Sequence, residues 1–144
     1  MTQLLYPIGI QSFTSIREGG YVYVDKTAYI WRLVSRGKYY FLSRPRRFGK
    51  SLLLSTIEEF LRGRRELFDG LAISREDYGW AEHAVLHLDF TGRSYDSVES
   101  LDAHLSRTLE KWEAVYGGGL SDRAPEERFD ILSQGRLNRP GGRW

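Results

Sequence analysis

The sequence predicts an α/β fold, because segments with strand patterning alternate with segments of helical period. An aromatic run at residues 39–42 leads through a turn into a helix that begins near Lys50. A second strand is expected at residues 85–90, and apolar residues at helical spacing predict a long helix over residues 97–116. With 144 residues, 41% of them hydrophobic, the chain has room for one ordinary domain with a buried core.

The elements before the aromatic run are short. We expect an extended lead-in, a short helix, a short strand and a second helix, over residues 1–13, 12–18, 21–24 and 26–36. Asp25 is suited to cap the second helix, and Gly37 is suited to end it. A contact of Asp25-Lys26-Thr27 with a nucleotide or with the following loop is the alternative to the cap.

The elements after the turn are expected to be mainly helical. A helix over residues 50–62 ends at Gly63, and a single turn of helix follows within residues 64–73. The long helix ends at Gly117. We therefore expect a lead-in with its helix, a core, and a Gly-rich linker with a disordered tail, over residues 1–37, 38–116 and 117–144.

The turn before residue 50 has the residue types of a phosphate-binding loop. Gly49 allows a close approach of the backbone to phosphates, Lys50 can reach the β- and γ-phosphates, and the Ser51 hydroxyl can bind Mg²⁺. The helix N-terminus adds partial positive charge. The full pattern G-x-x-x-x-G-K-[ST] is broken by Arg44, so a basic turn in which Lys50 only begins a helix stays open. The candidate nucleotide-binding residues are Arg46, Arg47, Phe48, Gly49, Lys50 and Ser51.

Charge is distributed unevenly along the chain, although the net charge is only +2. Residues 1–72 hold 12 Lys and Arg against 6 Asp and Glu, whereas residues 73–144 hold 9 against 13. Basic residues around the loop would attract a polyphosphate, and they would equally attract a nucleic-acid backbone. A basic nucleic-acid or partner-binding module that uses no nucleotide is therefore the alternative function.

Several function classes find no support in the sequence. There is no cysteine, so a disulfide framework and a thiolate zinc site are excluded. The three histidines show no metal-ligand spacing. No secretory signal and no apolar run of membrane-spanning length is visible, so we expect a cytoplasmic protein without a membrane partner. The oligomeric state is left open.

Five motifs follow one another along the chain. They are Gly9 to Phe13, Tyr23 to Thr27, Ser43 to Thr56, Glu66 to Ile73 and His87 to Phe90. In this order they resemble the opening motifs of the bacterial AAA-ATPase-like family. The resemblance implies an ATP-binding P-loop domain of three-layer fold, often followed in longer relatives by a restriction-endonuclease-like domain. In that family Arg-Pro-Arg-Arg-Phe-Gly-Lys-Ser is the usual form of the loop, so Arg44 fits it.

Asp89 ends an apolar run and in this respect resembles a Walker B carboxylate, which holds Mg²⁺. The alternative is a turn with Thr91, and in the family the true Walker B strand, ending in Asp-Glu-Tyr-Asp, comes later. No such strand is found here. We therefore expect a truncated or frameshifted member with the N-terminal half of the fold, which binds ATP and Mg²⁺ but hydrolyses ATP weakly or not at all. Uncovered apolar faces would then favour aggregation.

Overall fold

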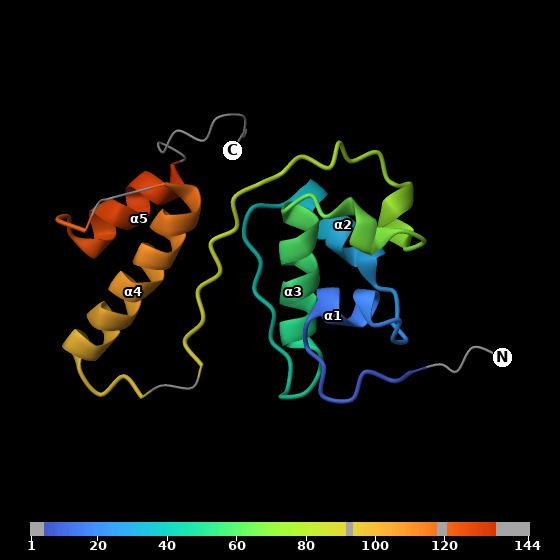
Figure 1. Ribbon diagram of the computed structural model, residues 1–144, viewed down its shortest axis with the longest axis horizontal. Helices are drawn as coiled ribbons and strands as arrows, with labels where there is room; N and C mark the ends of the chain where they lie inside the picture. The colour runs from blue at the N-terminus through green and yellow to red at the C-terminus, as the bar shows by residue number, and fades with distance from the viewer. Residues whose placement is uncertain (1–4, 92–93, 118–120, 135–144) are drawn as a thin grey trace. The chain divides into compact units, whose positions relative to one another are not determined.

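The computed structural model describes residues 5–91, 94–117 and 121–134 (Figure 1). Contacts between Cα atoms divide the chain into two compact units, Met1–His83 and Ala84–Trp144. The predicted division into residues 1–37, 38–116 and 117–144 stays a prediction. Residues 1–4, 92–93, 118–120 and 135–144 of it lie outside the described residues.

Both units are helical. The first unit contains α1 (Phe13–Glu18), α2 (Thr27–Arg36), α3 (Lys50–Leu61) and two 3₁₀ turns, η1 (Arg65–Phe68) and η2 (Ala72–Arg75). The second unit contains α4 (Val98–Tyr116) and α5 (Pro125–Ser133). Helix α5 lies within the segment that the sequence predicts to be linker and tail. No helix among the described residues has the length and apolar character needed to cross a membrane.

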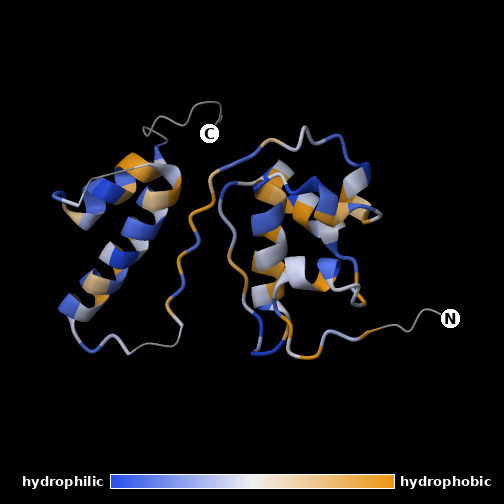
Figure 2. Ribbon diagram, in the orientation of Figure 1, coloured by the Kyte–Doolittle hydropathy of each residue, from blue (hydrophilic) through white to orange (hydrophobic). Residues whose placement is uncertain are grey.

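The predicted α/β fold is wrong, because the described residues form no β-strand. The partial three-layer P-loop architecture is therefore not present in them either. The runs at residues 39–42 and 85–90 are drawn as extended coils in Figure 1. Within the part of the chain that the structure describes, strand-like pairing is limited to one parallel bridge between Leu5 and Tyr21. Hydrophobic and hydrophilic residues do alternate along residues 86–90 (Figure 2). Alternation alone makes no sheet, because backbone N–H and C=O groups need a neighbouring strand as partner.

Serine side chains cap the N-termini of two helices, α1 and α4. The Ser12 hydroxyl accepts a hydrogen bond from the Ser15 N–H at the start of α1, at 3.2 Å. Ser97 and Ser100 form a reciprocal capping box at the start of α4. These bonds satisfy N–H groups that have no acceptor within the helix. The short helix expected near residues 12–18 and the long helix expected over residues 97–116 therefore form almost as predicted.

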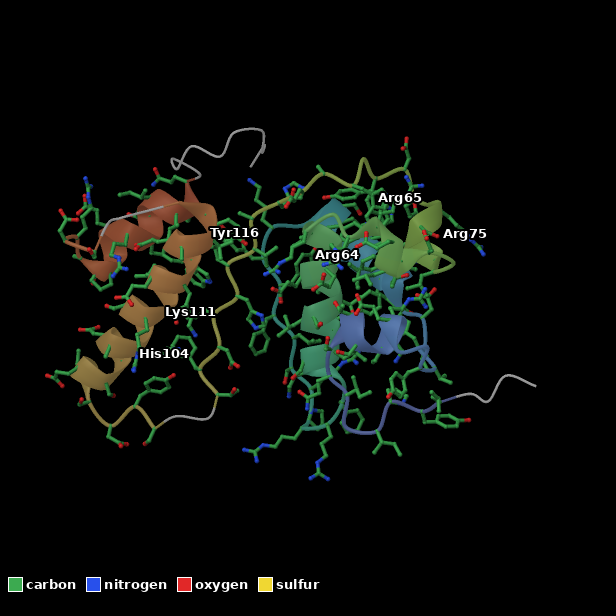
Figure 3. The ribbon with its side chains drawn as sticks, viewed as in Figure 1. Arg64, Arg65, Arg75, His104, Lys111 and Tyr116 are labelled. Carbon is green, nitrogen blue, oxygen red and sulfur yellow. The ribbon has the colours of Figure 1, made fainter. Side chains whose placement is uncertain are left out.

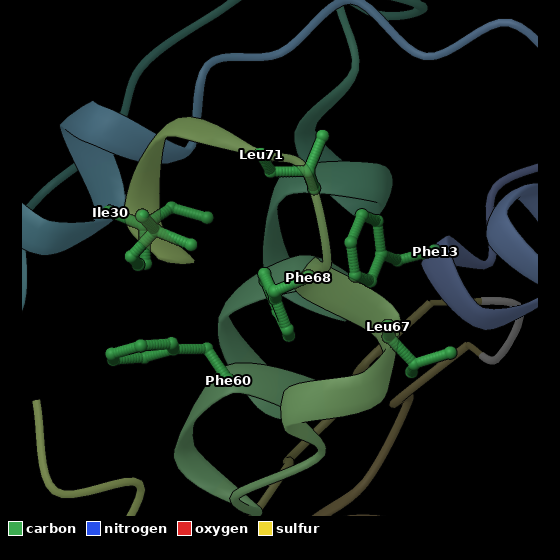
Figure 4. Packing of buried hydrophobic residues seen from close by; sticks show 7 residues of the cluster. Phe13, Ile30, Phe60, Leu67, Phe68 and Leu71 are labelled. Atoms are coloured by element: carbon green, nitrogen blue, oxygen red, sulfur yellow. The ribbon is translucent and has the colours of Figure 1, made fainter. Parts of the chain in front are cut away.

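An aromatic core holds the first unit together (Figure 4). Phe60 of α3 is fully buried, and its ring centroid lies 4.6 Å from that of Tyr78 and 5.2 Å from that of Trp80. Phe13 of α1 packs against Phe68 of η1 with ring centroids 4.8 Å apart. Burying rings of this size is the main favourable term for folding of this unit. The buried face of α3, which carries Phe60, therefore holds this helix in place.

Asp25 joins α2 to η2. Its carboxylate accepts hydrogen bonds from the backbone N–H and the hydroxyl of Thr27, at 2.8 and 2.7 Å, and from the backbone N–H of Ala72, at 2.7 Å. The Thr27 hydroxyl in turn accepts from the Ile73 N–H at 3.1 Å. Burial raises the pKa of Asp25, but the hydrogen bonds from Thr27 and Ala72 outweigh it and lower the pKa below its ordinary value. All these bonds are internal, which argues against a nucleotide contact. The expected cap by Asp25 is wrong in position, because Lys26 is the N-cap of α2 and no described side chain caps that helix.

We expect Asp25→Ala to lower the free energy of unfolding of the first unit by about 1 kcal/mol at neutral pH, because it removes the acceptor of three hydrogen bonds from α2 and η2. Because the folded pKa is depressed, the contribution of the carboxylate is present above the unfolded pKa, about 3.9, and is lost as pH falls through the folded value. Urea unfolding of both proteins at neutral pH and in acid measures this difference. A gap between variant and wild type that stays constant into acid would contradict this role.

In the second unit, α5 packs on α4. Leu109, Trp112 and Tyr116 of α4 form a buried cluster with Leu132 of α5. The Tyr116 hydroxyl also bonds to Val85, accepting from its N–H at 3.0 Å and donating to its carbonyl at 3.1 Å. The extended segment before α4 is thus tied to the end of that helix.

One ion pair is buried in the second unit. The guanidinium of Arg128 on α5 donates from Nε to Oε1 of Glu113 on α4 at 2.7 Å, and from Nη2 to Oε2 at 3.0 Å. Both side chains are almost completely buried. This two-pronged geometry fixes the angle at which α5 lies on α4, because both hydrogen bonds require the planar groups to face one another.

Candidate functional site

The candidate site is the loop of residues 44–51 in the first unit, between the extended run and α3. The sequence signal Gly-Lys-Ser falls where the helix begins, since Gly49 is the N-cap of α3 and Lys50 is its first residue. Gly49 has φ = 73°, in the left-handed region that favours glycine. An added Cβ would meet open space there, so the backbone conformation, rather than crowding, requires the glycine.

Arg47 also adopts a left-handed conformation, with φ = 67°. For a residue with a side chain this conformation costs about 1–2 kcal/mol relative to ordinary helical values. Left-handed residues in a turn direct backbone N–H groups toward a common side, which is how anion-binding loops are built. No sequence signal indicates this strain at Arg47, because arginine has no preference for positive φ.

The Lys50 ammonium group is folded back onto its own loop. Its Nζ donates hydrogen bonds to the backbone carbonyls of Arg44 and Pro45, the second at 3.3 Å. The cation is therefore held beside the turn, near the N-terminus of α3, rather than extended into solvent. These two carbonyls are positioning groups that the sequence could not reveal, since every residue type carries a carbonyl.

The first turn of α3 has free hydrogen-bonding capacity. No described side chain caps it, as is also true of α2 and α5, whereas serines cap α1 and α4. The repeating hydrogen bonds of α3 begin at Leu53, whose N–H donates to the carbonyl of the N-cap Gly49 at 2.9 Å. The N–H groups before it have no acceptor within the helix, and together with the helix dipole they favour an anion. Ser51 is exposed on this same turn.

The loop is strongly basic and open to solvent. Arg44, Arg46, Arg47 and Phe48 are all exposed. Among the described residues, no acidic side chain forms an ion pair with the loop arginines. The six predicted nucleotide-binding residues are consecutive in the chain and lie in this loop and at the start of α3, and their role stays a prediction.

Asp89, the second predicted Mg²⁺ ligand, belongs to the other unit. Its carboxylate accepts hydrogen bonds from the backbone N–H of Thr91 at 2.8 Å and from the Thr91 hydroxyl at 2.9 Å. These bonds lower the pKa of Asp89 below its ordinary value. The geometry is that of a turn, which is the alternative expectation for this residue. Its role as a metal ligand stays a prediction.

No cluster of three or more His, Asp and Glu side chains suited to a metal ion is found within the described ranges. At the loop itself the Ser51 hydroxyl is the candidate ligand. A protein-only Mg²⁺ site is thus not supported by these residues. A site completed by phosphate and water oxygens fits the loop, because Mg²⁺ keeps several waters and binds readily to substrate phosphates.

Comparison with known proteins places the chain in a family. The family model described as Predicted AAA-ATPase, the AAA-ATPase-like family, matches residues 7–139, and the chain belongs to this family. A curated relative from Azotobacter chroococcum mcd 1, described as an uncharacterized protein in the vnfD 5' region, is 40% identical over 134 residues. That match covers 92% of this chain and 26% of the relative, so the chain spans about a quarter of the relative's length. No solved structure matches.

Proposed function

We propose that the loop of residues 44–51 binds the polyphosphate of ATP together with Mg²⁺. The observation that carries this proposal is the Lys50 ammonium group, held by loop carbonyls beside the uncapped first turn of α3. A lysine cation next to free N–H groups is the arrangement that binds β- and γ-phosphates in P-loops. Membership of the predicted AAA-ATPase family supports the choice of ATP.

In this proposal each residue has a limited role. Lys50 exchanges its carbonyl partners for phosphate oxygens, and the N–H groups from Arg46 to Ser51 surround the anion. Ser51 supplies a hydroxyl oxygen to Mg²⁺, whose other ligands are phosphate and water oxygens. The metal neutralises charge on the phosphates when bound. We assign no base to activate water, so the proposed activity is binding.

We expect Lys50→Ala to weaken binding of MgATP at least about tenfold, because it removes hydrogen bonds to a charged group worth roughly 1.5–3 kcal/mol. Thermal melts with and without MgATP measure this, since a hundredfold excess of ligand over its Kd stabilises a protein by about 2.7 kcal/mol. Lys111→Ala is the matched control. It removes the same charge from α4 of the second unit (Figure 3) and should leave the ligand-induced shift unchanged.

Two results would overturn the proposal. One is a wild-type melt that millimolar MgATP does not shift. The other is an equal loss of binding in Lys50→Ala and Lys111→Ala, because general electrostatic attraction would then account for the whole effect. Competition by inorganic tripolyphosphate tests the recognition of phosphate separately, since the proposed contacts involve no part of the base.

A further inference from the structure

A groove lies within the second unit, beside the buried cluster of α4 and α5, and its volume is about 290 Å³. The buried residues Leu109 and Trp112 of α4 line it, together with Phe129 of α5, which is 46% exposed. The ring centroids of Trp112 and Phe129 lie 6.4 Å apart, with an angle of 49° between the rings. The two helices therefore contribute neighbouring aromatic rings to one cavity.

The elements around this groove are fixed to one another. The buried ion pair between Arg128 and Glu113 holds α5 on α4. The extended segment before α4 adds Leu88 to the lining, and side chains of α4 hold this segment at the backbone of Val85 and at the Asp89 carbonyl. The groove is thus a feature of packed helices and of a segment tied to one of them, rather than of an unpaired strand edge.

Acidic side chains accompany the apolar lining. Asp102 of α4 and Glu126 and Asp130 of α5 all line the groove, and all three are exposed. None of them forms an ion pair within the described ranges, and no described Lys or Arg lines the groove. Three uncompensated carboxylates beside an apolar cavity make the local potential negative, which attracts cations. We call the cavity the α4–α5 groove and these three carboxylates its acidic rim.

The size and chemistry of the α4–α5 groove favour a peptide as its occupant. Pockets for drug-sized ligands have volumes of about 300–1,000 Å³, so this groove is at the lower limit for such a ligand. Apolar grooves between helices accept the apolar face of an amphipathic helix, whose anchors recur every three or four residues. The acidic rim selects Lys or Arg on the flanks of that helix, because complementary charge gives an interface its specificity.

We propose that the α4–α5 groove binds a basic amphipathic helix of a partner protein. A large apolar side chain of that helix packs against Trp112 and Phe129, and its Lys and Arg side chains pair with the acidic rim. Central aromatic residues in a groove usually carry much of the binding energy, whereas exposed ion pairs at its edge add less. This function is separate from the proposed ATP site in the first unit and does not depend on it.

The test measures binding of a fluorescein-labelled peptide to the full chain by fluorescence anisotropy. The peptide has about 14 residues, with Leu on one helical face and Lys elsewhere. We expect Phe129→Ala to weaken binding at least about fivefold, because it removes an aromatic wall of the groove. Phe41→Ala is the matched control, since it deletes the same ring at an exposed position in the first unit and should bind the peptide as the wild type does.

Neutralising the acidic rim tests the role of charge. Glu126→Gln with Asp130→Asn removes two carboxylates with little change of side-chain size and should weaken binding roughly two- to thirtyfold, since each exposed pair contributes modestly. The matched control, Glu110→Gln with Asp122→Asn, removes the same charge from exposed positions outside the groove lining. It should change binding less than about twofold, because salt screens the more distant charges.

The proposal fails if folded Phe129→Ala binds the peptide like the wild type, or if a peptide with Glu in place of Lys binds as tightly. It also fails if sedimentation shows a wild-type dimer that Phe129→Ala dissociates, because the occupant is then a second copy of the chain. Hydrogen exchange in α4 checks that the variant is folded, and the rim variant decides if it is not. The MgATP-induced shift should be unchanged in all these variants, so either proposal can fail alone.

Discussion

Replacement of Phe60 by alanine is expected to lower the free energy of unfolding of the first unit by about 3–5 kcal/mol. Phe60 is fully buried on α3, and its ring touches those of Phe68, Tyr78 and Trp80. The substitution removes the apolar area of the ring and leaves a cavity that its aromatic neighbours cannot fill without losing their own edge-to-face contacts. A domain is typically stable by about 5–15 kcal/mol, so this loss takes much of the margin.

The effect should extend to the candidate site, because Phe60 anchors the helix whose first turn carries Lys50. Hydrogen exchange measured peptide by peptide follows each unit separately, and protection in α3 should fall while protection in α4 stays at its wild-type level. Phe41→Ala is the matched control, since it deletes the same ring at an exposed position and should change stability by less than about 0.5 kcal/mol. Equal effects of the two substitutions would show that the Phe60 cluster does not hold the unit together.

Most helices are predictable from the sequence because their signals are local. The apolar spacing that predicts α4 is the face that buries Leu109, Trp112 and Tyr116. Helix α5 departs from the prediction, although Pro125 at its first position and two acidic residues in its first turn are the usual signals of a helix start. These signals are not sufficient by themselves, because the residues that follow them lack a clear helical period.

The strand predictions fail for a different reason. Residues 39–42 have the composition of a strand, but a strand is stable only when a second segment takes up its hydrogen bonds. Whether such a partner lies alongside is a property of the whole fold, which no local pattern encodes. In the described residues the consequence is visible as exposed rings at Tyr39 and Phe41.

The candidate site is predictable in its residue types but not in its geometry. Gly49, Lys50 and Ser51 indicate an anion-binding helix start by their chemistry, and the structure places them at the N-terminus of α3. The left-handed conformation of Arg47 and the carbonyl partners of Lys50 depend on the path of the backbone. For Asp89 the sequence does not decide between two roles, because a carboxylate after an apolar run fits a metal ligand and a turn equally well. Its hydrogen bonds to Thr91 are those of a turn.

Replacement of Arg128 by leucine is expected to destabilise the second unit by about 3–5 kcal/mol, because it leaves the Glu113 carboxylate buried without its partner. Most of this loss should be recovered in the double variant Glu113→Leu with Arg128→Leu, since two apolar side chains of suitable size can replace a buried ion pair. Denaturant unfolding, with hydrogen exchange in α4 and α5 to assign the change to this unit, measures both effects.

The nearby exposed pair between Arg123 and Glu127 supplies the control. Arg123→Leu also removes an arginine from an ion pair, but solvent screens that pair, so its effect should stay below about 1 kcal/mol. If Arg128→Leu were no more harmful than Arg123→Leu, the pair would not fix α5 on α4. If the double variant were as unstable as Arg128→Leu alone, lost packing of the arginine stem, rather than the unpaired carboxylate, would be the cause.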